Sequence, residues 1–305
     1  MSEMNAFYEK LDELFDGGDL AAIEAYIMGA VAEAPEGGAE RAALLNELAG
    51  FFRGISRFDE SEQAFLESLG LFELNGMGAS LEYATVLLNL AGLYRIKGEP
   101  DKAIEMFLNA MKKLEDAGEA ESYAYISILN NISLAYQGKN EYAIALGYAQ
   151  KALELMRNGG GGAHEIAVSL NNIAAIRIGL GELDAAGELI SEALSVYDGM
   201  EEENVHHAAA LTTKAVLLVR TGDYQGALRG FQESLALVKR FFGENIEYAV
   251  CKRNISDVFE LLGDIPAAVA ELSDAVTIMS RILGLGHQNV KDMRDKLIAL
   301  EVKLP

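Results

Sequence analysis

This sequence predicts an all-α fold, a right-handed superhelix of about six stacked helix hairpins, from three observations. Half of its 305 residues are apolar and only four are proline, which allows a continuous core and favours unbroken helices. A pattern of small and turn-forming residues recurs along the chain at steps of 41 or 42 residues. Large residues such as Phe52, Tyr94 and Tyr136 accompany the pattern at helical spacing. Together these features indicate an array of repeats.

Each repeat has small residues where two antiparallel helices would cross. The first small position holds Ala49, Ala91, Ser133, Ala174, Ala215 and Ser256. Two further small positions hold Ser61, Ala103, Ala145, Ala186, Ala227 and Ala268, and then Ser68, Ala110, Ala152, Ala193, Ser234 and Ala275. Because small side chains let helices approach closely, we expect each unit to be a hairpin that stacks on its neighbours.

A turn position follows the first small residue of every repeat. It lies seven residues further on and holds Ser56, Gly98, Asn140, Gly181, Gly222 and Gly263. Helices commonly end in a residue with a left-handed backbone, which glycine adopts freely and most other residues resist. The first helix of each hairpin is therefore expected to end at this position.

The two ends of the chain fit the array less closely. The stretch Leu11–Val31 matches the template loosely, so residues 1–40 are predicted to form a degenerate N-terminal repeat. Residues 41–283 are predicted to form the six full repeats. Residues 284–305 contain HQNVKDMRDKLIALEVKL, which reads as one amphipathic helix with a charged outer face. Such a helix is what the end of a solenoid requires, so we expect a C-terminal cap.

This set of positions resembles the tetratricopeptide repeat family. The matching features are a Leu–small pair, an aromatic residue three positions on, then Gly, Ala and a second Ala, over about Leu44–Ile282. The family's usual repeat is about 34 residues long. The longer step here is similar to the kinesin-light-chain-like subclass, as are the linkers GGGGAHEIA and GLGHQNV. The resemblance implies a solenoid whose first helices line the inside of a superhelix and bind peptide or protein segments.

Other function classes lack support in the sequence. The net charge of −22 argues against a nucleic-acid partner, which would need a basic face. No apolar segment is long enough to cross a bilayer, no signal peptide begins the chain, and we expect a cytoplasmic protein. Cys251 is expected to be a buried structural thiol. His164, His206, His207 and His287 are placed in linkers, and no metal site, cofactor or catalytic group is predicted.

A stripe of polar side chains is the predicted binding site. Residues two and three before the first small position, and four after it, share one helix face. Amides recur at these places and arginines stand near both ends of the set. The predicted site residues are Asn46, Arg53, Asn89, Arg95, Asn130, Asn131, Gln137, Asn171, Asn172, Thr213, Arg253 and Asn254.

Two roles are open for these amides. An amide both donates and accepts, so it can pair with either backbone group of a peptide, as asparagines at this position do in related grooves. Alternatively, the amides bridge consecutive repeats and only stabilise the stack. Arg177 and Lys214 also depart from the pattern, since aromatic or aliphatic residues stand at their positions elsewhere. They indicate either a local irregularity with exposed charged ends or a deliberately polar spot.

The leading functional hypothesis is a non-catalytic scaffold that binds a peptide or protein segment in the inner groove. The alternative is a cytoplasmic regulator that senses a peptide and changes its superhelical pitch on binding. An enzyme is a distant third. The sequence predicts neither the identity of the partner nor the oligomeric state.

Overall fold

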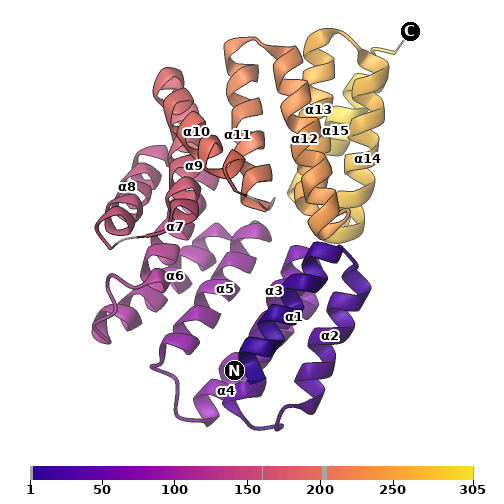
Figure 1. Cartoon of the computed structure of the whole chain (residues 1–305). Helices are drawn as coiled ribbons and strands as arrows, with labels where there is room; N and C mark the ends of the chain where they lie inside the picture. Colours follow the sequence, from indigo (N-terminus) through magenta and orange to yellow (C-terminus); the bar gives the residue numbers. More distant parts are fainter. Residues whose placement is uncertain (1–2, 160, 201–204, 305) are drawn as a thin grey trace. The chain divides into compact units, whose positions relative to one another are not determined.

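The computed structural model describes residues 3–159, 161–200 and 205–304, which form fifteen α-helices and no strand (Figure 1). The prediction of an all-α fold built from helix hairpins is confirmed. The chain divides into two compact units, residues 1–141 and 142–305. Within the described ranges, no helix combines the length and apolar character that a bilayer crossing needs.

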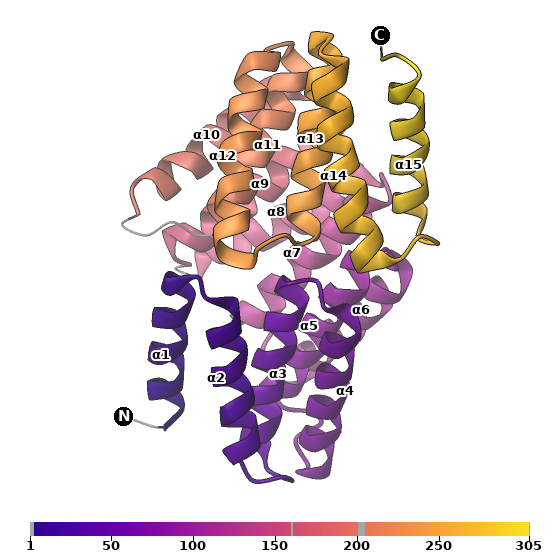
Figure 2. The ribbon, with the colours of Figure 1, turned by 90° about the vertical axis from the view of Figure 1, so that its right-hand side faces the viewer.

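The first unit contains seven helices. These are α1 (Glu3–Gly17), α2 (Leu20–Glu33), α3 (Ala39–Gly54), α4 (Phe58–Leu74), α5 (Leu81–Ile96), α6 (Pro100–Asp116) and α7 (Tyr123–Gly138). Helix α1 pairs with α2, α3 with α4 and α5 with α6, and each hairpin packs on the next one along the chain (Figure 2). Serine hydroxyls begin two of the helices, since Ser80 accepts the Tyr83 backbone N–H and Ser122 accepts that of Tyr125.

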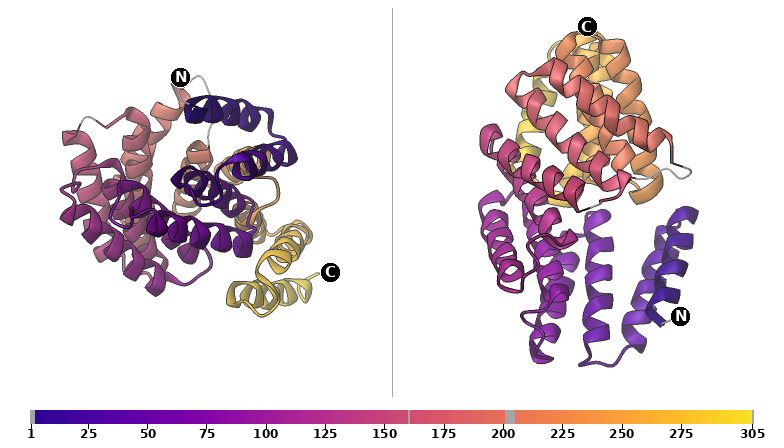
Figure 3. Two further views of the ribbon diagram at one scale, coloured as in Figure 1. Left: turned by 90° about the horizontal axis from the view of Figure 1, so that it is seen from below. Right: turned by 60° about the vertical axis from the view of Figure 1, so that its left-hand side comes forward.

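The second unit contains eight helices. These are α8 (Tyr142–Asn158), α9 (Ala163–Leu180), α10 (Leu183–Asp198), α11 (Val205–Thr221), α12 (Tyr224–Phe242), α13 (Ile246–Leu262), α14 (Ile265–Leu283) and α15 (Gln288–Glu301). Three successive hairpins, α9–α10, α11–α12 and α13–α14, stack in chain order. Helix α15 lies along α14 next to the C-terminus (Figure 3). It is tied to α13 by Lys296, which pairs with Asp257 at 2.7 Å and with Glu260 at 3.1 Å.

The turn position behaves as predicted in all six repeats. Ser56 and Asn140 have φ of 63° and 60°, and the four glycines at this position, Gly98, Gly181, Gly222 and Gly263, have φ between 81° and 89°. This left-handed backbone ends the first helix of each hairpin. Ser56 and Asn140 adopt it despite having a side chain, which costs more than it does for glycine.

The small positions are also as predicted. All 18 side chains at the three small positions are fully buried, at 0% exposure. Four of the five serines at these positions donate to a backbone carbonyl, whereas the Ser133 hydroxyl has no hydrogen bond among the described residues. Ser61 Oγ donates to the Ala49 carbonyl at 2.8 Å, and Ser256 Oγ donates to the Ala268 carbonyl at 2.7 Å. A buried hydroxyl without such an acceptor would be costly, so these contacts explain why serine fits a helix crossing.

Candidate functional site

In the first unit, the polar stripe is held together by bonds between repeats. The side chain three before the small position in one repeat pairs with the side chain two before it in the next repeat. Asn89 Nδ2 donates to Asn46 Oδ1 at 2.9 Å. Tyr8 has the position in its repeat that Asn46 has in the next one, because each lies ten residues before the turn residue, Gly18 or Ser56. The Tyr8 hydroxyl donates to Glu47 Oε1 at 3.3 Å. The same register therefore makes the same kind of contact twice in succession.

Arg53 strengthens this arrangement. Its Nη1 donates to the Asn89 carbonyl at 2.9 Å, and its guanidinium lies 6.0 Å from the centre of the Phe65 ring. Gly92 makes room for it, because a Cβ on that residue would come within 3.1 Å of Nη1. The arginine at the N-terminal end of the stripe thus links α3 to α5.

Glu47 is the one acidic member of this network. Asn46 Nδ2 also donates to it, at 3.4 Å. Burial raises the pKa of the Glu47 carboxyl, and the hydrogen bonds from Tyr8 and Asn46 oppose that shift without cancelling it. The pKa of Tyr8 rises to about 12, through burial and the nearby carboxylate. This part of the stripe is occupied by its own contacts, which supports the stacking role for Asn46, Asn89 and Arg53.

The side-chain bond between consecutive repeats is missing between α5 and α7, because a leucine stands at the bonding position in α5. Leu88 stands three before the small position in α5 and offers no hydrogen bond to α7. Asn131 Nδ2 turns back instead and donates to the Ser127 carbonyl of its own helix at 2.9 Å. Asn130 is buried in α7, while Arg95 on α5 and Gln137 on α7 are half-buried. Asn130 and Arg95 both form other contacts, but the buried Asn130 Oδ1 and Arg95 Nε take part in no hydrogen bond among the described residues.

In the second unit, the corresponding amides lie on α9 and are not paired in this way. Asn171 and Asn172 are 9% and 8% exposed. Asn171 Oδ1 is buried, and no group in the described part of the chain donates to it. The partner expected from the register is Thr213 on α11, but its hydroxyl donates to the Ala209 carbonyl of its own helix at 3.1 Å. The bridge seen between α3 and α5 is therefore absent between α9 and α11.

The stripe continues on α13 with a cation. Arg253 Nη2 donates to Asn254 Oδ1 at 3.2 Å, while Arg253 Nε is buried and has no acceptor among the residues that the structure describes. Between α9 and α13, Thr212 is turned inward, where its hydroxyl lies 2.8 Å from Ser234 Oγ and 3.7 Å from Cys251 Sγ. Cys251 is buried as predicted, and burial raises the pKa of its thiol.

The second unit thus presents one acceptor and one donor that lack partners at the same register position, on α9 and α13. Buried polar groups are nearly always hydrogen-bonded in native proteins. An amide oxygen needs a donor and a guanidinium N–H needs an acceptor, and a peptide backbone supplies both. The sequence placed these residues in the stripe but could not separate them from Asn46, which holds the equivalent position and is paired with Asn89.

Arg177 and Lys214, the two departures from the repeat pattern, have different surroundings. Arg177 Nη1 forms an ion pair with Glu182, just beyond the turn of its own hairpin. Lys214 is exposed and lines a pocket formed by α10, α11 and α12. The charged end of Arg177 thus stays near solvent, while Lys214 leaves a gap in the packing of its repeat.

The placement of the histidines in linkers is wrong for three of the four and correct for His287, which lies in the linker between α14 and α15. His164 lies in the first turn of α9, and His206 and His207 lie in the first turn of α11. His287 caps α15, where its Nδ1 accepts the Asn289 backbone N–H at 3.2 Å. The helices begin earlier than expected because a helix start needs only a suitable N-cap and tolerates polar residues in its first turn. Among the described residues, no three side chains of His, Cys, Asp or Glu gather in a way that could hold a metal ion.

Comparison with solved structures shows where this fold recurs. The structure of RapI is 15% identical over 92% of this chain and 98% of its own, with a TM-score of 0.65. A Rap protein complexed with competence and sporulation factor is 13% identical over 98% of this chain and 99% of its own, with a TM-score of 0.58. BtubC from P. vanneervenii is 20% identical over 72% and 91%, with a TM-score of 0.53. At these identities the likeness concerns the fold.

Sequence comparison is more specific. No curated protein matches the chain. The family model for the tetratricopeptide repeat matches three segments, residues 40–116, 124–199 and 206–281, which together cover most of the sequence. Each matched segment contains two of the six hairpin repeats. The chain belongs to the tetratricopeptide repeat family.

Proposed function

We propose that this protein is a non-catalytic scaffold that binds a peptide or protein segment on the first helices of its second unit. Family membership supports protein–protein interaction in general. The observation that carries the more specific proposal is the buried Asn171 Oδ1, which has no donor within the described residues. Its counterpart in α3, Asn46, is already paired with Asn89. The Asn171 oxygen is closed to solvent, so the side chain would turn outward to accept a backbone N–H from a bound segment, and that bond would remove the deficit.

The proposed site extends from Asn171 and Asn172 on α9, past Thr213 on α11, to Arg253 and Asn254 on α13. Helix α9 packs on α11, and packed helices lie about 8–10 Å apart, so two steps span at least roughly 16–20 Å. An extended chain rises about 3.3 Å per residue, so at least about five or six residues are needed to reach from Asn171 to Arg253. Arg253 would receive a backbone carbonyl or a carboxylate at the far end, because its Nε lacks an acceptor among the described residues.

The charge around Arg253 favours this arrangement. Glu260 lies two turns further along α13 and could neutralise a cation in the stripe. It is instead bonded to two lysines of the C-terminal region, Lys296 at 3.1 Å and Lys303 at 2.7 Å. These lysines lower the pKa of the Glu260 carboxyl, which keeps it charged and paired with them. The positive charge of Arg253 is therefore left for a ligand.

A peptide-sensing regulator is the second candidate. Two Rap structures match nearly the whole chain, and one of them was solved with competence and sporulation factor bound to it. A regulator of this kind would bind its peptide at the same site as the scaffold. It would differ from the scaffold in that its superhelical pitch changes when the peptide binds. Small-angle scattering with and without ligand separates the two candidates, because a scaffold keeps its radius of gyration and a sensor becomes more compact.

We keep two further predictions within this proposal, namely that the protein acts without catalysis and that it works in the cytoplasm. Both agree with a repeat scaffold, whose task is to hold a partner. An activity screen on the purified chain would contradict the first if it found turnover that Asn171→Ala abolishes. Fractionation of cells that make the tagged protein would contradict the second if the protein left the cytoplasmic fraction.

The proposal is tested with nine-residue peptides selected by display on the full chain. The tightest peptide is then titrated into wild-type protein, Asn171→Ala and Asn89→Ala. Removing one hydrogen bond is expected to cost about 0.5–1.5 kcal/mol, so Asn171→Ala should weaken binding by roughly 2- to 12-fold. Asn89→Ala is the control, an asparagine of the first unit's stripe that lies two rather than three residues before the small position, and should leave affinity unchanged. Equal affinities for all three proteins would refute the assignment.

A further inference from the structure

The pocket beside Lys214 arises from a single break in the repeat. The residue just before the first small position is Leu48, Leu90, Ile132, Ile173 or Ile255 in the other five repeats, and none of these is more than 8% exposed. In the fifth repeat the same position holds Lys214, whose side chain is exposed. A lysine ammonium cannot be buried without a partner, so its side chain leaves the space that an aliphatic residue fills elsewhere.

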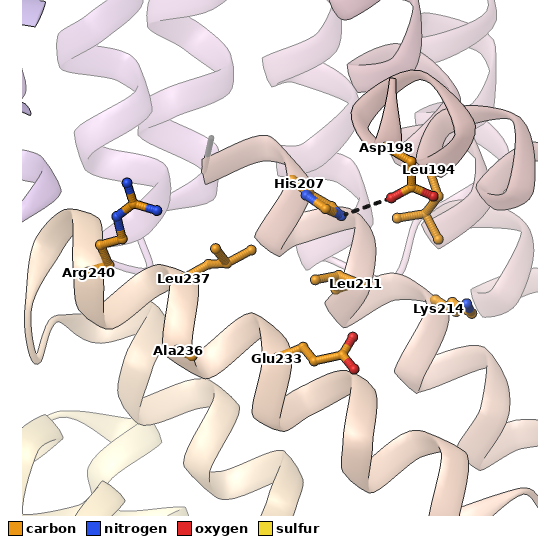
Figure 4. A pocket seen from close by; sticks show the side chains of 9 residues that line it. All are labelled: Leu194, Asp198, His207, Leu211, Lys214, Glu233, Ala236, Leu237 and Arg240. Atoms are coloured by element: carbon orange, nitrogen blue, oxygen red, sulfur yellow. Dashed lines mark ion pairs between the residues drawn. The ribbon is translucent and has the colours of Figure 1, made fainter. Parts of the chain in front are cut away.

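The rest of α11 does not make up for this loss. Its buried residues are Ala208, Ala210, Thr213 and Ala215, all of them small. The equivalent helix α9 buries three isoleucines, and α13 buries two isoleucines with a valine and a tyrosine. A pocket of about 590 Å³ lies beside Lys214 and is lined by residues of α10, α11 and α12 (Figure 4). This volume lies within the range of about 300–1,000 Å³ that is common for ligand sites.

The pocket walls combine apolar and charged groups. Leu194, Leu211 and Leu237 come from three different helices and form the apolar part. Asp198 and His207 line another side and lie within ion-pair distance of each other, at 3.8 Å (Figure 4). In the described part of the chain, neither the Lys214 ammonium nor the Glu233 carboxylate has a hydrogen bond or an ion pair. Arg240 is a further cation of the lining and lies 5.5 Å from the centre of the Phe241 ring. Lys214 and Glu233 are therefore the oppositely charged pair that we assign to a ligand beside the aliphatic surface.

This pocket is separate from the proposed peptide site. With about 100° of rotation per residue in an α-helix, His207, Leu211 and Lys214 lie on one face of α11. Thr212 and Thr213 lie on the other side of the helix, at the register of the polar stripe. A ligand in the pocket would leave the stripe uncovered.

We infer that this pocket binds a small aliphatic zwitterion of the size of a dipeptide. Its carboxylate would pair with Lys214, its ammonium with Glu233, and its aliphatic side chains would pack on Leu194, Leu211 and Leu237. Charge complementarity supports this class of ligand, because an anion alone would leave Glu233 unpaired and a cation alone would leave Lys214 unpaired. The walls are open to solvent, so we expect a dissociation constant on the order of 0.1–1 mM.

The test is a titration of the full chain with leucyl-leucine, followed by backbone amide chemical shifts. Saturable shifts are expected in α10, α11 and α12. N-acetyl-leucyl-leucine, which lacks the ammonium, and leucyl-leucinamide, which lacks the carboxylate, should each bind at least about ten-fold more weakly. Absence of saturable shifts up to about 10 mM would overturn the inference, as would equal binding of all three compounds.

Two variants place the binding at this pocket. Lys214→Ile restores the residue type of the other repeats, so the variant is expected to fold and to lose binding at least ten-fold. Glu233→Gln should weaken leucyl-leucine and leave the N-acetyl compound unaffected. Glu188→Gln, on an exposed part of α10 outside the pocket, is the control and should bind as wild type does. Wild-type affinity in Lys214→Ile would show that the dipeptide binds elsewhere and would overturn the inference.

Discussion

The polar stripe on α3 and α5 of the first unit and the polar stripe on α9 and α13 of the second unit have similar sequences and different bonds. On α3 and α5, Asn46 and Asn89 hydrogen-bond to one another and Arg53 bonds to the backbone of the next repeat. On α9 and α13, the buried oxygen of Asn171 and the buried Nε of Arg253 have no partner within the described residues. The asparagines of the polar stripe can therefore have two roles in one chain. The role of each depends on the residue that faces it from the next repeat.

Among the polar contacts of the stripe, the largest effect on stability is expected at Arg53. Arg53→Ala removes a charged hydrogen bond to the backbone of α5, and bonds to charged groups contribute about 1.5–3 kcal/mol. Arg253, the stripe arginine of the second unit, stands at a different repeat position, and Arg253→Ala loses only a contact with the neighbouring Asn254 and should cost under about 1 kcal/mol. Urea unfolding of both variants measures the difference. Equal losses would contradict the contrast between the two units.

A smaller contrast is expected between two asparagines. Asn89→Ala removes one side of a bridge and leaves Asn46 Oδ1 without its donor, which should cost about 1 kcal/mol. Asn171→Ala removes a buried oxygen that is already unpaired and introduces a better helix former, so stability should stay the same or rise slightly. Thermal melting curves compare the two. A lower midpoint for Asn171→Ala than for Asn89→Ala would reverse the assignment.

Filling the pocket is expected to stabilise the second unit. Lys214→Ile adds an aliphatic side chain where five other repeats bury one, and such cavity-filling changes commonly contribute about 0.5–2 kcal/mol. Leu90→Lys is the reverse change in the first unit, where the native leucine is 1% exposed, and should destabilise it strongly. Chemical denaturation of the two variants checks the pair. A loss of stability in Lys214→Ile would show that the position requires a charge.

The smallest effect is a pH dependence that belongs to the first unit. Because burial raises the pKa of Glu47, the folded state binds a proton there more tightly than the unfolded state does. This contribution to stability is present below the unfolded pKa, near 4.3, and is lost as pH rises through the folded pKa. Glu47→Gln should therefore gain stability relative to wild type as pH rises from about 4 to 7. Unfolding curves that stay parallel over this range would contradict it.

The fold was predictable because its signals are local and repeated. The turn positions and small positions recur six times, so one irregular residue such as Ser56 or Asn140 does not hide the pattern. The helix starts at His164 and His206 were missed because polar residues in a first turn look like linker. The residues of the polar stripe were predicted from their spacing along the sequence alone. Tyr8 could have been assigned to the stripe in the same way, because it lies ten residues before Gly18. Which asparagines are paired was not predictable, since that depends on side-chain directions across two repeats.

One measurement tests the central contrast most directly: affinity and melting temperature measured together for a display-selected peptide and two single variants. Asn171→Ala is predicted to bind the peptide several-fold more weakly and to melt no lower than wild type. Asn89→Ala is predicted to bind with wild-type affinity and to melt at a lower temperature. The opposite pattern, with Asn171→Ala destabilised and fully able to bind, would make the second stripe a stacking element and contradict the account.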